Sequence, residues 1–177
     1  MTVAQPPLSS EQLADQQLSL ISPTAAEDEE RFSAAVGRVC KVLLTSAIYR
    51  NSPLADLEWL VFPPVALGQC AVLHGLVDGF PVPVACALWA SISSEVATRL
   101  ETTSVAPLQL EPEEWKSGPI LWLIEAVGDP SAVSELLSGL QAQLFKDTTV
   151  RCRVVGNGAA TFTTLAELLK SGSSNAV

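Results

Sequence analysis

Two apolar runs separated by a tight-turn dipeptide constrain the fold most strongly. Residues 65–74 and 81–90 flank Asp78-Gly79, and an Asp-Gly pair between apolar segments is a strong signal for a two-residue β-hairpin. A further apolar run at residues 118–127 is short enough for a buried strand, and residues 149–155 alternate well enough for another. The chain is therefore expected to form a sheet that begins with an antiparallel pair.

Apolar side chains at helical spacing predict helices around these strands. Between residues 27 and 47, apolar residues recur every three or four positions, and the acidic start of this segment suits the positive end of a helix dipole. Residues 130–145 have the same spacing and begin with a proline, which suits a first turn. Shorter helices are predicted at 54–61, 93–100 and 163–170. This order of elements predicts a mixed α/β domain.

Length and composition indicate one domain with tails at both ends. The chain has 177 residues, of which 48% are hydrophobic, enough for a single core. Residues 1–26 are rich in Gln, Ser, Pro and Ala and are expected to be a flexible N-terminal tail. Residues 27–155 form the expected domain, and residues 156–177 a C-terminal helix and flexible tail. The sequence lacks a long apolar run and a signal-peptide pattern, so we expect no membrane span and a cytoplasmic location.

Charge and cysteine usage narrow the classes of partner and cofactor. The net charge of −9 argues against nucleic acid or an anionic membrane as the main partner. The four cysteines lack CxxC spacing and His74 is the single histidine, so a structural zinc site of the usual kind has no support. We expect buried, reduced thiols and no bound metal or cofactor.

Five separated motifs point to a family. They are Ser46-Ala-Ile-Tyr-Arg50, Leu54-Ala-Asp-Leu-Glu-Trp59 with the following Pro63-Pro64-Val65 and Gly68-Gln69, Gly79–Ala90 with its Trp89-Ala90, Glu114-Trp-Lys-Ser-Gly118, and Trp122-Leu-Ile-Glu125. Taken in their order and spacing over about residues 39–154, these motifs resemble those of the RTX toxin-activating lysine-acyltransferases, which transfer a fatty acyl group to internal lysines of pore-forming toxins.

The resemblance implies a fold, an activity and a set of site residues. The implied fold is a single-domain, GNAT-like acyltransferase with a mixed, mainly antiparallel sheet flanked by helices. The implied reaction moves a fatty acyl group from an acyl carrier protein thioester to lysines of an RTX-type protein. Tyr49 stands where the family has a histidine, and Glu125 where it has an aspartate. The residues carried over are Tyr49, Glu125 and Ser46 as catalytic candidates, and Arg50, Trp89 and Trp122 as substrate-binding candidates.

Because Tyr49 and Glu125 differ from the residues of the family, more than one mechanism and function is consistent with the sequence. Acylating a lysine requires removal of a proton, because the ordinary pKa of its ammonium group is near 10.4. Tyr49 is a poor base at pH 7 but can donate a hydrogen bond, whereas Glu125 can act as a base if it is partly buried. A carboxylate within an apolar run also requires a polar cleft or a partner such as Arg50. The alternatives are a catalytically silent relative that binds a protein or an acyl chain, and an acyl-CoA-dependent GNAT enzyme, for which the sequence lacks a pyrophosphate loop.

Acyl carrier proteins are acidic, so an acidic chain requires a local basic patch to bind one. The candidate residues are Arg31, Arg38, Lys41 and Arg50 along the first predicted helix, and Arg151 and Arg153 on the last predicted strand. A homodimer is a further candidate assembly.

Overall fold

The computed structural model describes residues 18–20, 29–103, 107–156 and 159–171. Within these residues the chain forms one six-stranded sheet in the order β1-β2-β3-β4-β5-β6, in which only β4 and β5 run parallel. The expected mixed α/β domain with a mainly antiparallel sheet, as in a GNAT-like fold, is confirmed. The strands are β1 (Leu18–Leu20), β2 (Cys70–Val77), β3 (Phe80–Ile92), β4 (Ile120–Gly128), β5 (Val150–Gly156) and β6 (Ala159–Thr164).

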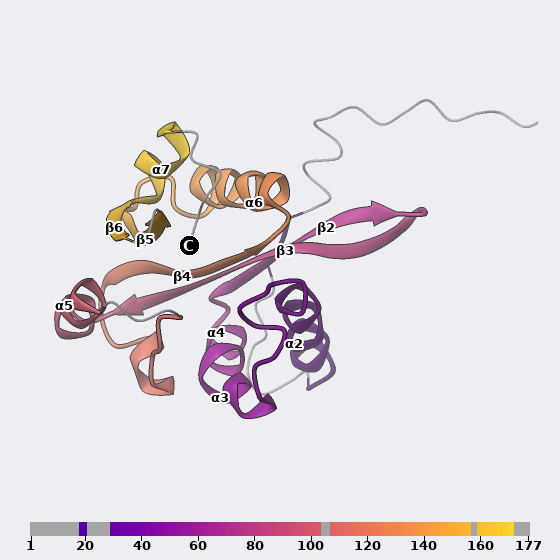
Figure 1. Cartoon of the computed structure of the whole chain (residues 1–177), viewed down its shortest axis with the longest axis horizontal. Coiled ribbons are helices and arrows are strands. Elements are labelled where there is room, and N and C mark those ends of the chain that lie inside the picture. Colours follow the sequence, from indigo (N-terminus) through magenta and orange to yellow (C-terminus); the bar gives the residue numbers. More distant parts are fainter. Residues whose placement is uncertain (1–17, 21–28, 104–106, 157–158, 172–177) are drawn as a thin grey trace, which may run out of the picture.

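Helices cover both faces of the sheet and create two hydrophobic cores (Figure 1). One face carries α2 (Glu29–Leu43), α3 (Leu57–Leu60), α4 (Phe62–Ala66) and α5 (Ser94–Thr102), together with the short 3-10 helices η1 (Leu54–Asp56) and η2 (Pro112–Trp115). The other face carries α6 (Pro130–Gln143) and α7 (Leu165–Ser171). None of the helices described is long and apolar enough to cross a membrane.

The β2–β3 hairpin has the turn that its sequence predicts. Asp78 and Gly79 both have positive φ, 51° and 81°, the combination that defines a type I′ turn. The first strand begins later than expected, at Cys70, because residues 62–66 form α4. Pro63 and Pro64 lie in the first turn of that helix, where the missing N–H leaves no hydrogen bond unmade, and so they start a helix instead of only ending one.

A β-bulge in β4 decides which face of the sheet receives Glu125. Leu88 of β3 pairs with Glu125, and the next residue, Trp89, pairs with Leu123, so Ile124 is an extra residue in the ladder. Paired residues share a face, and Leu88 belongs to the core beneath α2. Strict alternation would have placed Glu125 with Leu123 beneath α6. The bulge therefore turns this carboxylate toward the α2 face.

The sheet extends beyond both boundaries that the sequence suggested. Leu18–Leu20, within the expected N-terminal tail, pair with Ala71–Leu73 as edge strand β1. At the other end, β6 pairs with β5 throughout residues 159–164, so the sheet continues past residue 155. The rest of the expected tails, residues 1–17, 21–26 and 172–177, lies outside the described residues.

Candidate functional site

Tyr49 enters the core from the turn that follows α2. The helix ends at Leu43, four residues before its predicted end, and the chain then turns through residues 44–52. Ser46 organises this turn, because its carbonyl accepts a hydrogen bond from the Arg50 N–H at 3.0 Å and its hydroxyl accepts one from the Ile48 N–H at 3.2 Å. As a result the Tyr49 side chain is 5% exposed and packs against the sheet.

Glu125 is a buried carboxyl group that faces Tyr49. Its side chain is 6% exposed. Burial raises the pKa of Glu125 to about 7, and interaction with the Tyr49 hydroxyl and the positive charge of Arg153 partly oppose this rise. Burial and the nearby Glu125 charge raise the pKa of Tyr49 far above its ordinary value. The tyrosine therefore stays protonated at any physiological pH, while the carboxyl group titrates near neutrality.

The Tyr49 hydroxyl is poised but unsatisfied. It lies close enough to Glu125 for each group to shift the pKa of the other. Among the described residues, however, the hydroxyl oxygen is buried and no partner lies in hydrogen-bonding geometry. A buried polar group without a partner is unfavourable by about 1–3 kcal/mol. This cost disappears when a partner, such as a water molecule or a substrate atom, bonds to the hydroxyl.

Tyr49, Glu125 and Ser46 line one pocket of about 180 Å³. Its far wall is the end of β4, where Gly128 has a φ of 138°. A Cβ at this position would lie 2.2 Å from the Val84 carbonyl oxygen, so only glycine allows β4 to approach β3 so closely. The lining residues are Thr45, Ser46, Ile48, Tyr49, Glu125, Ala126, Val127 and Gly128. We call this space the polar pocket.

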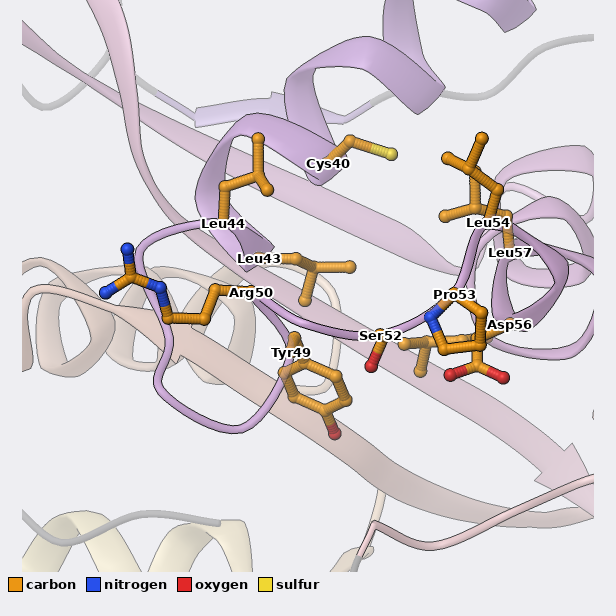
Figure 2. Close-up of a pocket in the computed structure, with 11 residues that line it drawn as sticks. Cys40, Leu43, Leu44, Tyr49, Arg50, Ser52, Pro53, Leu54, Asp56 and Leu57 are labelled. Carbon is orange, nitrogen blue, oxygen red and sulfur yellow. The ribbon is translucent and has the colours of Figure 1, made fainter.

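Tyr49 also lines a second, apolar pocket of about 160 Å³. In Figure 2 the Tyr49 ring lies below Leu43 and its hydroxyl points away from the leucine side chains of this pocket. The Arg50 guanidinium and Leu54 lie at opposite ends of the view. The lining residues are Cys40, Leu43, Leu44, Tyr49, Arg50, Ser52, Pro53, Leu54, Asp56, Leu57 and Leu60. Tyr49 is thus shared by a polar and an apolar pocket.

Trp89 and Arg50 are not where the sequence analysis placed them. Trp89 was expected to contact the substrate, and Arg50 was a candidate partner for Glu125. Trp89 lies in the core beneath α6, on the opposite face of the sheet from Tyr49, where its ring meets Phe145 edge-on at 5.5 Å. It cannot contact a substrate in the polar pocket. Arg50 is exposed and borders the apolar pocket, so it does not serve as the buried partner of Glu125.

Trp122 lies in the core beneath α2 but lines neither pocket. It is fully buried, its ring meets Phe162 at 6.2 Å, and its indole nitrogen has no hydrogen-bond partner among the described residues. Its side chain belongs to the core beneath α2, and the linings of the polar and apolar pockets do not include it.

The positive charge near Glu125 comes from Arg153, which the sequence suggested only as part of a surface patch. Arg153 is 4% exposed and donates a hydrogen bond to the Thr103 carbonyl at 3.2 Å. Its charge lowers the pKa of both Glu125 and Tyr49, against the effect of burial. The sequence places Arg153 between the apolar residues Cys152 and Val154 of a predicted strand. This pattern alone could not show that the Arg153 side chain lies near Glu125.

Comparison with models of known protein families identifies a match for most of the chain. The model of the RTX toxin acyltransferase family (HlyC) matches residues 28–166, which include Tyr49, Glu125 and Arg153. No curated protein matches the chain. Among the described residues, no group of three or more histidine, cysteine or acidic side chains is placed to hold a metal ion.

Proposed function

The chain belongs to the RTX toxin acyltransferase family, and from this premise we propose that it acylates lysines of an RTX-type toxin with Glu125 as base and Tyr49 as hydrogen-bond donor. The observation that carries the proposal is the buried pair itself. The two side chains line one pocket, Glu125 titrates near pH 7, and the Tyr49 hydroxyl has no partner in the described residues. A base is most effective when its pKa lies near the working pH.

The proposed reaction uses each of these groups in turn. The lysine reacts as its neutral amine, after its ammonium proton has passed to solvent, and the Glu125 carboxylate takes a proton from this nitrogen as it attacks the thioester carbonyl carbon. The Tyr49 hydroxyl donates a hydrogen bond to the carbonyl oxygen as negative charge develops on it. The carbon–sulfur bond then breaks, an amide remains on the lysine, and the departing thiolate receives the proton from Glu125.

The apolar pocket offers a place for the alkyl chain of the donor. Its lining is dominated by leucine side chains, and its wall is the ring of Tyr49, whose hydroxyl faces the other way (Figure 2). A cavity of about 150 Å³ accommodates a benzene molecule, so a pocket of about 160 Å³ holds roughly six carbons. A longer chain would extend over Leu44 and Leu54, which are exposed at its rim.

The donor that we propose is an acyl carrier protein thioester, bound beside α2. Arg31, Arg38 and Lys41 lie on this helix, and Arg50 follows it at the edge of the apolar pocket. The basic residues on β5 are less suited to bind an acidic carrier, because Arg151 pairs with Glu101 at 2.8 Å and Arg153 is buried.

Mass spectrometry of a purified RTX-type toxin incubated with this protein tests the proposal. Donors are fatty acyl thioesters of acyl carrier protein and of coenzyme A, the latter to detect the acyl-CoA-dependent alternative. Wild type should add an acyl group to lysine, Glu125→Gln should abolish transfer, and Tyr49→Phe should reduce the rate by about 10²-fold or more as one oxyanion donor is lost. Transfer by Glu125→Gln at the wild-type rate would show that Glu125 is not the base.

A catalytically silent relative is the second candidate. The observation that favours it is the strongly raised pKa of Tyr49, which removes any base from the position of the family histidine. This candidate predicts that wild type transfers no acyl group from either donor, yet binds the toxin as tightly as Glu125→Gln and Tyr49→Phe do.

A further inference from the structure

The polar pocket has a buried floor and an exposed mouth. The exposed lining residues, Thr45 and Ile48, lie at the mouth, and Ser46 and Gly128 are half-buried. The floor is formed by the buried lining residues, which are Tyr49, Glu125, Ala126 and Val127. A side chain that reaches Glu125 from solvent therefore enters at the mouth, beside Thr45 and Ile48.

Ile48 is the large apolar side chain at this mouth. It is 62% exposed, although Tyr49, the next residue in the chain, is buried. Hydrogen bonds within the turn hold the two side chains apart, because the Ile48 N–H donates to the Ser46 hydroxyl at 3.2 Å and the Ser52 N–H donates to the Tyr49 carbonyl at 3.0 Å. A β-branched side chain also has few rotamers to lose on contact. Ile48 thus offers a preformed apolar contact.

The hydroxyl groups beside Ile48 are already bonded within the turn. The Thr45 hydroxyl donates to the Val42 carbonyl at 2.7 Å, and the Ser46 hydroxyl accepts the hydrogen bond from the Ile48 N–H. Contact with this part of the mouth therefore depends chiefly on apolar surface.

The geometry of the proposed reaction decides which substrate meets Ile48. The lysine nitrogen of the acceptor must reach Glu125 at the floor, so the acceptor backbone stays at the mouth, one lysine side chain away. The residues that flank the lysine then lie beside Ile48. The alkyl chain of the donor takes the apolar pocket, whose lining does not include Ile48. Ile48 is therefore placed to contact the acceptor.

The chemistry of Ile48 indicates which flanking residues fit. A polar side chain pressed against it would lose water without gaining a hydrogen bond, which is unfavourable. An apolar side chain would remove its own surface and that of Ile48 from water, which is favourable.

We propose that Ile48 is a specificity-determining residue that selects acceptor lysines flanked by apolar side chains. This inference rests on the proposed function, because it assigns a contact to the acceptor of that reaction.

A matched pair of peptides and of variants tests the inference. The valine peptide is Ser-Val-Val-Lys-Val-Val-Ser, acetylated at its N-terminus and amidated at its C-terminus, and the threonine peptide has threonine in place of each valine. Each exchange replaces a methyl group with a hydroxyl group. Ile48→Val and Ile48→Thr differ in the same way. Leu76→Thr is the control, because Leu76 is 64% exposed and lines neither the polar nor the apolar pocket.

The measured quantity is the ratio of kcat/KM for the valine peptide to kcat/KM for the threonine peptide. Wild type should prefer the valine peptide about fivefold or more, since contact with Ile48 removes the equivalent of one or two CH₂ groups from water. Ile48→Val and Leu76→Thr should keep most of this preference, and Ile48→Thr should reduce it to about twofold or less. Partial unfolding of a variant cannot imitate this result, because the ratio does not depend on the concentration of active protein.

Three results would overturn the inference. The first is a wild type that does not distinguish the two peptides. The second is an equal preference in wild type and Ile48→Thr. The third is a raised KM for the acyl carrier protein thioester in Ile48→Thr with an unchanged peptide preference, which would assign Ile48 to the donor.

The proposed function is judged separately, by transfer to the toxin. If wild type transfers to neither peptide, fluorescence anisotropy of the labelled peptides measures the same preference as binding. Wild type should then bind the valine peptide about fivefold more tightly than the threonine peptide, and Ile48→Thr should lose this difference. Equal binding of the two peptides by wild type would reject the role of Ile48, whatever the toxin assay shows.

Discussion

At the scale of single residues, the site depends on balancing charge against burial. Burial of Glu125 favours its neutral form and raises its pKa. The positive charge of Arg153 stabilises the carboxylate and lowers the pKa in part. Burial also favours the neutral form of Tyr49, so its hydroxyl stays protonated and cannot act as a base near pH 7. The pair thus contains one group that can accept a proton near pH 7 and one that stays protonated and can donate a hydrogen bond.

The pH dependence of acyl transfer should report on Glu125. The base must be ionised, so the rate should rise with pH and reach half its maximum near pH 7, the pKa of this carboxyl group. Arg153→Gln removes a positive charge that favours the carboxylate, so the pKa of Glu125 rises and the rising limb moves to higher pH.

Arg151→Gln is the control for this measurement. It removes an arginine of the same strand that forms a surface ion pair with Glu101, and it should leave the limb in place. A profile that shifts equally in both variants, or in neither, would contradict the role assigned to Arg153.

At the scale of the elements, the site depends on irregularities of β4. The extra residue Ile124 turns Glu125 to the α2 face, and Gly128 lets the end of the strand approach β3 beside the polar pocket. Without the extra residue, strict alternation would turn Glu125 to the α6 face. With any residue other than glycine at position 128, a Cβ would hold the end of β4 away from β3.

Gly128→Ala should destabilise the protein strongly. The new Cβ would meet the Val84 carbonyl oxygen and the Ala85 backbone, and the φ of 138° is strained for any residue with a side chain. We expect a loss of about 3 kcal/mol or more in the free energy of unfolding, measured by urea denaturation.

Gly37→Ala is the matched comparison. This exposed glycine lies within α2, and a Cβ there would meet nothing within 4 Å. Alanine should therefore stabilise the helix by about 0.5–1 kcal/mol. Similar changes in both variants would mean that the approach of β4 to β3 is not as tight as described.

At the scale of the whole molecule, one sheet joins segments from both ends of the chain. Strand β1, from residues 18–20, pairs at one edge, and β6, from residues 159–164, forms the other. Among the described residues, the end of the β2–β3 hairpin projects beyond the helical layers (Figure 1). The site lies between the turn that follows α2 and the end of β4.

The contribution of β1 can be measured by truncation. A protein that starts at residue 21 lacks the strand that pairs with Ala71–Leu73, whereas one that starts at residue 18 retains it. Loss of these backbone hydrogen bonds should lower Tm of the shorter protein by a few degrees relative to the longer one. Equal Tm values in calorimetry would show that β1 adds no stability to the sheet.

The sequence by itself determined the features that depend on neighbouring residues or on motif order. The Asp78-Gly79 turn, α6 with its leading Pro130, and the family all follow from local patterns. It also selected Tyr49 and Glu125, which line one pocket.

Only the tertiary structure decided which side chains meet. Trp89 lies beneath α6, away from Tyr49, and Arg153 turns inward toward Glu125. The reason is that the face reached by a strand residue depends on pairing with other strands. One extra residue, such as Ile124, exchanges the two faces, and no local pattern in the sequence records such an exchange.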